Sequence, residues 1–156
     1  MNSDEYYMKK VLELAFMAQK SSEIPVGAII VKDEKIIAEA YNQKDTKKIV
    51  TKHAEIIAIE QANITEKDWR LCGATIYVTM EPCPMCASAI QQARIKRLVY
   101  GCSSNIRENT VIINKILKNP KYNHSVEITS GVLEKECSEL IKNFFKLKRQ
   151  KNKFHV

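Results

Sequence analysis

The sequence predicts an α/β fold in which one β-sheet is covered by helices on both faces. Segments with the apolar spacing of helices alternate along the chain with short β-branched or aromatic runs that are typical of strands. No linker, internal repeat or low-complexity block interrupts this alternation, and 156 residues suit one domain with its own core. We therefore expect a single domain.

Helices are expected where apolar residues recur with helical spacing or where a residue suits a helix start. Thr51 is a plausible N-cap, and Pro82 suits the first turn of a helix. The expected helices are residues 4–20, a segment from Thr51 through HAEIIAIEQA, CPMCASAIQQAR after Pro82, VIINKILKN, and the basic tail.

Strands are expected where β-branched and aromatic residues cluster between turn signals. The first two form a hairpin that turns around Asp33 and Glu34. The expected strands are VGAIIVKD, KIIAEAYN, residues 74–79 (ATIYVT), residues 97–101 (RLVYG), and a short extended segment in VEITSGV.

The composition is that of an ordinary globular protein, with 45% hydrophobic and 28% charged residues. The longest apolar runs, such as IPVGAIIV, are too short to cross a bilayer, and the acidic start MNSDEYY lacks the pattern of a signal peptide. We expect a cytoplasmic protein with no membrane partner, in which the five cysteines stay reduced.

The positive charge is concentrated at the C-terminal end. The net charge is +7, and residues 142–153 hold six Lys or Arg residues and no acid. On a helix, one stripe of this segment would be basic (Lys142, Lys146, Arg149, Lys153) and another apolar (Leu140, Phe144, Leu147). This stripe is either a solvated helix face or a surface that binds a polyanion.

Cys83 and Cys86 form a C-x-x-C pair, whose spacing alone is compatible with a metal site, a redox dithiol or simple burial. His53 adds an imidazole, so the three side chains supply three of the four ligands of tetrahedral Zn²⁺ and leave one position for water. A structural zinc site would need a fourth protein ligand. The remaining candidates stand at no paired ligand spacing: Cys72, Cys102, Cys137 and His124.

Glu55 stands two residues after His53, near the start of the same expected helix. Two thiolates neutralise the charge of the zinc, so a nearby proton acceptor becomes useful for activating water. A glutamate in a first helical turn can also simply favour the helix dipole. The combination of H-A-E with P-C-x-x-C favours the catalytic interpretation.

These motifs resemble those of bacterial tRNA-specific adenosine deaminases, members of the zinc-dependent cytidine/deoxycytidylate deaminase superfamily. The resemblance runs along nearly the whole chain. It is carried by PVGAIIV, YN at Tyr41 and Asn42, TKHAEIIAI, WRL, ATIYVTMEPCPMCASAI, YNHSVEITSGVLEKEC and FFKLKRQ.

The resemblance implies a cytidine-deaminase-like three-layer α/β/α fold, with a central mixed sheet of about five strands. Residues 1–156 would form one deaminase domain with a basic C-terminal helix at about 133–153. The family's usual state is a homodimer with one Zn²⁺ per subunit and a water or hydroxide as fourth ligand. Its reaction converts the wobble adenosine of an arginine tRNA to inosine.

The resemblance also assigns roles to residues of the expected site. His53, Cys83 and Cys86 would bind zinc, and Glu55 would move protons during attack on a base extruded from its stack. The substrate-binding residues would be Asn42, Val26, and the backbone at Ala54 and Pro82. Asn42 could instead cap a turn, and Val26 could be core.

The basic tail resembles a family motif that faces the tRNA anticodon stem-loop. We expect Lys142, Phe145, Lys146, Arg149 and Lys153 to contact RNA, with a log-log salt slope of roughly −3 to −4 if the four basic residues all meet phosphates. Ser104, Asn123 and His124 also match family positions near RNA. A buried, hydrogen-bonded role for the histidine is equally compatible with the sequence.

Residues 102–113 depart from the family pattern. The family usually has an aspartate, a lysine and several glycines here, whereas this chain has CSSNIRENTVII. Ser104 takes the place of the aspartate, and Arg107 is the candidate replacement for the lysine. We hypothesise an altered grip on the nucleotide beside the target base. Unchanged RNA affinity and RNA-over-DNA preference in Ser104→Asp would refute it.

Three functions remain compatible with the sequence. The first is a tRNA adenosine deaminase, and the second is a deaminase of a free base or nucleoside of the guanine or cytosine type. The third is a non-catalytic, zinc-stabilised RNA-binding module, for which Glu55 would be dispensable.

Overall fold

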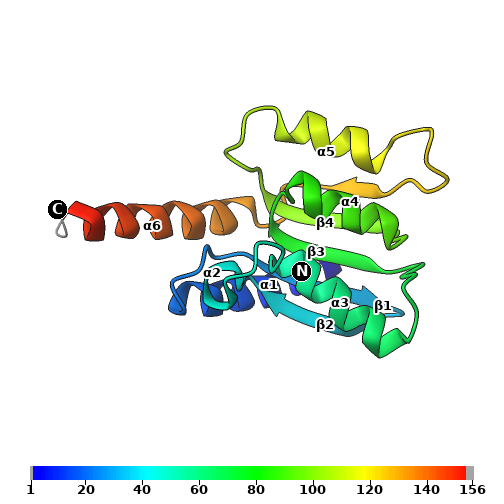
Figure 1. Cartoon of the computed structure of the whole chain (residues 1–156), viewed down its shortest axis with the longest axis horizontal. Helices are drawn as coiled ribbons and strands as arrows, with labels where there is room; N and C mark the ends of the chain where they lie inside the picture. The colour runs from blue at the N-terminus through cyan, green and yellow to red at the C-terminus, as the bar shows by residue number, and fades with distance from the viewer. Residues whose placement is uncertain (1, 154–156) are drawn as a thin grey trace.

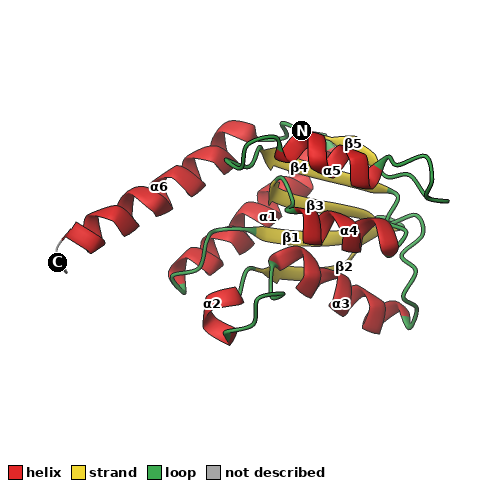
Figure 2. Ribbon diagram, turned by 45° about the horizontal axis from the view of Figure 1, so that its top comes forward, coloured by secondary structure: helices red, strands yellow, loops and turns green. Residues whose placement is uncertain are grey.

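A computed structural model describes residues 2–153 and shows a five-stranded mixed sheet between two layers of helices (Figures 1 and 2). The strands lie in the order β2-β1-β3-β4-β5. They are β1 (Gly27–Lys32), β2 (Lys35–Tyr41), β3 (Thr75–Met80), β4 (Arg97–Cys102) and β5 (Glu127–Thr129). The expected three-layer α/β fold is confirmed.

The sheet changes direction at its centre. β1 is antiparallel to both β2 and β3, whereas β3, β4 and β5 run parallel. Parallel neighbours require a crossover, which the helix between β3 and β4 provides. The C-terminal ends of β3 and β4 therefore meet at one edge of the sheet.

Two helices cover one face of the sheet and three cover the other. α1 (Ser3–Lys20) and the first half of α6 (Glu134–Lys153) pack on one face. α3 (Ala54–Glu66) and α4 (Pro84–Gln92) lie on the opposite face, and α5 (Asn109–Leu117) packs on α4 (Figure 2). The core between the layers is formed by residues such as Met8, Ile30, Ile76 and Leu98, all fully buried.

Two predicted helix starts are wrong by two or three residues. α3 begins at Ala54 with His53 as its N-cap, because a turn in which the His53 amide donates to the Thr51 carbonyl precedes it. α4 begins at Pro84 rather than at Pro82. A residue before proline is driven out of the helical region, so Cys83 is extended (φ −72°, ψ 169°) and becomes the N-cap.

The C-terminal helix docks with a face that overlaps the expected apolar stripe at Phe144, which is buried, and at Leu140, which is half-buried. Its buried residues are Cys137, Ile141 and Phe144, whereas Leu147 is 51% exposed. The C-terminal part of the helix projects beyond the sheet (Figure 1), and Leu147, Lys148 and Lys151 line a hollow with Gln19 of α1. At its base, a β-carbon on Gly101 of β4 would overlap Cys137 Sγ and lie 2.8 Å from the Thr79 carbonyl oxygen, so α6 sits directly on the strand.

A short helix that the sequence did not predict, α2 (Lys44–Lys47), follows β2. The fully buried Glu23 holds it by accepting hydrogen bonds from the backbone amides of Asp45 and Thr46. Within residues 2–153, none of the helices combines the length and apolar character needed to span a bilayer.

Candidate active site

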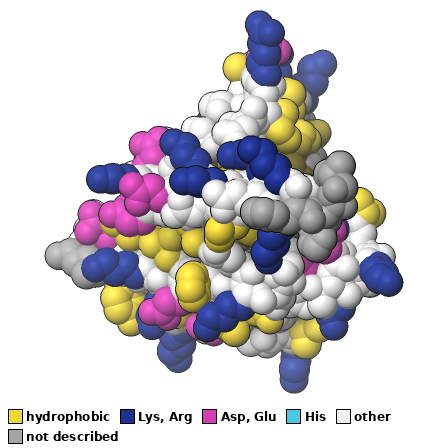
Figure 3. Space-filling view, turned by 90° about the vertical axis from the view of Figure 1, so that its left-hand side faces the viewer, with side chains coloured by type: hydrophobic (Ala, Val, Ile, Leu, Met, Phe, Trp, Pro, Cys, Tyr) yellow, Lys and Arg dark blue, Asp and Glu magenta, His cyan; other side chains and the backbone are white. Residues whose placement is uncertain are grey.

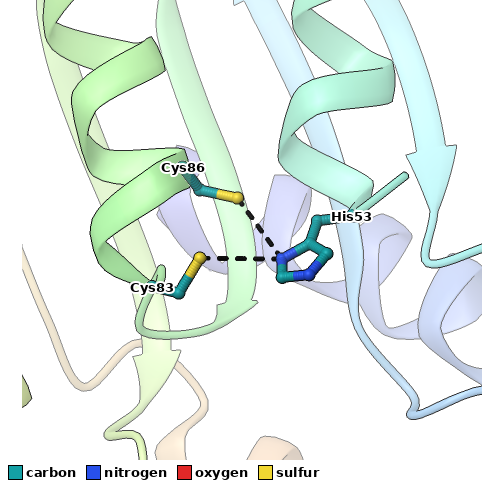
Figure 4. A group of neighbouring side chains, drawn as sticks. All are labelled: His53, Cys83 and Cys86. Atoms are coloured by element: carbon teal, nitrogen blue, oxygen red, sulfur yellow. Dashed lines mark hydrogen bonds between the residues drawn. The ribbon is translucent and has the colours of Figure 1, made fainter. Parts of the chain in front are cut away.

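The starts of two neighbouring helices bring the three predicted metal ligands together (Figure 4). His53 is the N-cap of α3, Cys83 is the N-cap of α4, and Cys86 lies one turn into α4. Their ligand atoms lie within 4.8 Å of one another, and both sulfur atoms point toward the imidazole. Residues separated by 30 positions in sequence thus form one donor set.

The distances within this group fit zinc. Each Sγ of Cys83 and Cys86 lies 3.6 Å from Nδ1 of His53. In a tetrahedral site, bonds of about 2.0–2.1 Å to nitrogen and about 2.3 Å to sulfur place the two ligand atoms about 3.6 Å apart. Among the described residues, no further cysteine, histidine or carboxylate joins this cluster, so its donor set matches a site with an open fourth position.

The three side chains shift one another's pKa values. A hydrogen bond from the buried Cys86 thiol lowers the pKa of Cys83 to about 4, and the Cys86 pKa is raised because that thiol is the donor. The contact with Cys83 raises the pKa of His53. A metal ligand must be a thiolate, so binding should release the proton that Cys86 carries.

Glu55 is a buried carboxyl group in the first turn of α3, next to the donor set. Only 4% of the residue is exposed. Burial raises the pKa of Glu55 to about 7, and the negative charge of Cys83 adds to the effect. A carboxyl group that titrates near neutral pH can both accept and return a proton, which is the property that general acid-base catalysis requires.

A pocket of about 210 Å³ opens beside these residues. Ligand sites for drug-sized molecules enclose about 300–1,000 Å³, so this pocket suits a group no larger than a single base. Its lining includes His53, Glu55 and Cys83, together with three of the four predicted substrate-binding residues, Val26, Asn42 and Ala54. The fourth, Pro82, is buried and does not belong to the lining; its carbonyl accepts a hydrogen bond from Asn109.

Asn42 caps a turn, one of the two roles that the sequence left open, and its role in binding substrate stays a prediction. Its side-chain oxygen accepts from the Lys44 amide at 3.2 Å, and its Nδ2 donates to the Ile24 carbonyl at 3.4 Å. These bonds cap the turn that follows β2, yet the side chain also lines the pocket. The turn therefore fixes an amide group at the pocket wall.

Several lining residues were missed by the sequence-based prediction. They come from four separate segments that only the fold brings together: Ile24, Lys44, Asp45, Met80, Glu81 and Ile106. Met80 and Glu81 immediately precede the P-C-x-x-C motif, which was a usable signal. Ile106 carried no signal, because it lies in the loop that departs from the family pattern. Ser104, from the same loop, also lines the pocket.

The predicted basic stripe is exposed on α6. Lys142, Lys146, Arg149 and Lys153 are all solvent-exposed, and Phe145 is half-buried. Lys142, Phe145 and Arg149 line a shallow hollow with Ile141 and with Asn105 of the loop after β4. Figure 3 views the side toward which α6 projects and shows Lys and Arg side chains spread over it. RNA binding by these residues stays a prediction.

The other two predicted RNA contacts lie at the opposite end of the sheet. A ring nitrogen of His124 lies 2.7 Å from the carbonyl oxygen of Ile95, which precedes β4, and the His124 carbonyl accepts from Gln91 at the end of α4. The pocket residues instead follow the C-terminal ends of β3 and β4. The ring of His124 thus ties a turn together, and Asn123 beside it is exposed.

Comparisons with known proteins identify relatives along nearly the whole chain. The profile of the MafB19-like deaminase family matches residues 1–149. The tRNA-specific adenosine deaminase of Bacillus subtilis (strain 168) is 39% identical over 98% of this chain and 95% of its own length. That of Buchnera aphidicola subsp. Schizaphis graminum is 41% identical over 95% and 97% of the two chains.

Two solved structures match the fold of this chain. A structure from studies of A-to-I editing by tRNA:A34 deaminases matches with a TM-score of 0.79 and 38% identity, over 86% of this chain and 98% of its own. A guanine deaminase from Nitrosomonas europaea shares the fold, with a TM-score of 0.76 and 20% identity over 92% and 85% of the two chains. This chain therefore belongs to the family of bacterial tRNA-specific adenosine deaminases.

Proposed function

We propose that this chain is the enzyme that hydrolytically deaminates adenosine to inosine at the wobble position of tRNA, with an arginine tRNA as its substrate. The observation that carries the proposal is the juxtaposition of His53, Cys83 and Cys86 with the buried carboxyl group of Glu55 at a base-sized pocket. Family membership over the whole chain supports the same reaction.

One Zn²⁺ per chain is the cofactor that this donor set fits. When bound, the metal makes a water molecule nucleophilic at neutral pH. The chain's own contribution is to hold the ion by Nδ1 of His53 and Sγ of Cys83 and Cys86, and to leave one position accessible from the pocket. The two helix N-termini favour the negative charge of the thiolates.

Glu55 moves the protons of the reaction. Its raised pKa lets it take one proton from the attacking water and deliver it to N1 of the purine. Glu55 then takes the remaining proton of the added hydroxyl group and passes it to the amino group, which leaves as ammonia. Adenosine and water are thereby converted to inosine and ammonia. The burial of Glu55 keeps bulk water away from these transfers.

The pocket wall positions the base. Ile24, Val26, Met80 and Ile106 provide apolar surface for the faces of an extruded base, and Asn42 provides an amide for its polar edge. The basic side chains of α6 would contact phosphates of the anticodon stem-loop. We propose a homodimer as the functional unit and the cytoplasm, where thiols stay reduced, as its location.

A substrate comparison tests the proposal. The zinc-loaded protein is incubated with an arginine tRNA transcript that carries adenosine at the wobble position, and separately with free adenosine, cytidine and guanine. We expect inosine in the transcript and no ammonia from the free compounds. Ammonia from a free base alone would instead indicate the second function, which the divergent loop of residues 102–113 favours.

A further inference from the structure

Glu81 is a buried carboxylate to which the mechanism assigns no role. The residue is 2% exposed, follows β3 directly, and stands two positions before the metal ligand Cys83. Burying a charged group is unfavourable unless hydrogen bonds compensate for its lost hydration. The partners of Glu81 therefore indicate what the carboxylate does.

The carboxylate accepts three hydrogen bonds from side chains on β4 and at the start of α5. Asn109 Nδ2 donates to Oε1 at 2.6 Å, while the hydroxyl groups of Tyr100 and Thr110 donate to Oε2. The backbone amide of Glu81 also donates to the Cys102 carbonyl at 2.8 Å. One residue thus joins the end of β4 to the first turn of α5.

The loop between these two anchor points, residues 103–108, forms part of the pocket wall. Ser104 and Ile106 line the pocket, and within the loop Ser104 Oγ accepts a hydrogen bond from the Ile106 amide. The loop ends at Glu108, whose φ of 63° lies in the left-handed region that costs a residue other than glycine conformational energy. The next two residues, Asn109 and Thr110, are held by their hydrogen bonds to Glu81.

We propose that Glu81 is a positioning residue that fixes both ends of this loop and so sets where Ser104 and Ile106 stand over the bound base. The inference rests on the proposed function, because the base is the ligand of that pocket. Glu81 affects how tightly the substrate binds, whereas Glu55 carries out the proton transfers. Its loss therefore raises KM and leaves kcat and the metal content unchanged.

Three variants separate this role from general support of the fold. Glu81→Ala removes every carboxylate contact, and Thr110→Val removes one of them at an exposed position of α5 where folding is not at risk. Glu81→Gln should keep the loop in place. Its side-chain oxygen can still accept a hydrogen bond from Asn109, and its amide group can donate to the hydroxyl groups of Tyr100 and Thr110. The control is Asn114→Ala, which removes a hydrogen bond to the Thr110 carbonyl on α5 and leaves the three side-chain contacts of Glu81 in place.

The first readout is independent of activity. Amide hydrogen exchange of Ile106 and Asn109, whose amides donate to Ser104 Oγ and to the Ile106 carbonyl, should become about tenfold faster in Glu81→Ala and Thr110→Val, with zinc still at one per chain. The second is steady-state deamination of the tRNA transcript. KM should rise about tenfold, the change that one lost hydrogen bond of ordinary strength produces, with kcat within about twofold of the parent. Glu81→Gln and Asn114→Ala should resemble the parent protein in both readouts.

Three outcomes would overturn the inference. Loop exchange and KM that do not change in Thr110→Val and in folded Glu81→Ala would show that the contacts do not fix the loop. A fall in kcat alone would place Glu81 in the chemistry, and loss of zinc would make it a support of the metal ligands. If the parent protein deaminated no tRNA at all, the proposed function would fail, while the exchange measurement would still decide whether Glu81 holds the loop.

Discussion

The metal centre and the pocket wall are held in place in different ways. His53 and Glu55 lie within three residues of one another at the start of α3, and Cys83 and Cys86 lie within one turn of α4. Each half of the centre is therefore set by local helix geometry. Two parts of the wall, α2 and the loop of residues 103–108, depend instead on partners more than 20 residues away.

Two buried carboxylates provide these long-range contacts. Glu23 accepts from the backbone amides of α2, and Glu81 accepts from the side chains at the start of α5. The residues of the metal centre thus lie in short sequence motifs, whereas the shape of the pocket depends on contacts across the whole fold. Changes in the centre should abolish turnover, and changes farther away should affect binding or stability alone.

The largest effect should come from the centre. Glu55→Ala removes the proton carrier, so kcat for the tRNA transcript should fall about 10²–10⁴-fold. Zinc should remain at one per chain, because Glu55 is not a ligand. Inosine in digested RNA and metal analysis measure the two quantities. Glu55→Gln preserves the side-chain volume and should be equally inactive; retained turnover in either variant would refute the proton-transfer role.

The next largest effect concerns the metal itself. Cys86→Ser removes a thiolate ligand, and we expect zinc affinity to fall more than about 100-fold, beyond the loss that substitutions around a metal's ligands cause. Zinc retained per chain during titration with a chelator measures this change. Cys72→Ser is the matched control, because Cys72 is exposed and lies outside the cluster. Equal zinc retention by both variants would contradict the assignment.

Substitutions on α6 should leave the centre and the wall intact and alter only the electrostatic part of RNA binding. Removing two phosphate contacts with Lys146→Ala and Arg149→Ala should reduce the magnitude of the log-log salt slope by about 1.4–1.8. Filter binding of an anticodon stem-loop at several salt concentrations measures the slope. Lys118→Ala with Lys121→Ala removes the same charge from exposed positions near the opposite end of the sheet and should not change it. Equal slopes in both pairs would exclude α6 from the interface.

The smallest effect is expected remote from both regions, where Asp4 of α1 forms a two-pronged ion pair with Arg97 of β4. Hydrogen bonds from Arg97 lower the pKa of Asp4, against the raising effect of partial burial, and the Tyr77 hydroxyl contributes a further hydrogen bond. Asp4→Asn should reduce the free energy of unfolding by about 1 kcal/mol at neutral pH.

The pH dependence of this difference follows from the direction of the shift. Because the folded-state pKa of Asp4 is lowered, its stabilising contribution is complete above the ordinary carboxyl pKa and is lost as the pH falls through the folded value. Urea unfolding at several pH values should show the difference between parent and variant shrinking below about pH 4. Glu13→Gln, an exposed carboxyl on the same helix, is the control. A difference that is the same at every pH would contradict the ion-pair explanation.

The sequence predicted the sheet, the order of the main helices and the clustering of His53, Cys83 and Cys86, because periodicity and short motifs carry that information locally. It misplaced the start of α4 because two prolines stand near it and only the conformation of Cys83 distinguishes them. It did not predict α2, whose first turn depends on Glu23, a residue that is 22 positions before Asp45. Ile106 was also missed, because it becomes a pocket residue only when the fold brings its loop close to segments that are distant in sequence.

The direction of the basic helix α6 depends on how its base packs on β4. The helix is about 30 Å long, and at its base Cys137 contacts Gly101, where there is no room for an added methyl group. A small rotation at this buried contact displaces the lysine-rich end of the helix by a larger distance. Substitutions in the core, far from any basic side chain, can therefore change the position of the basic residues of α6.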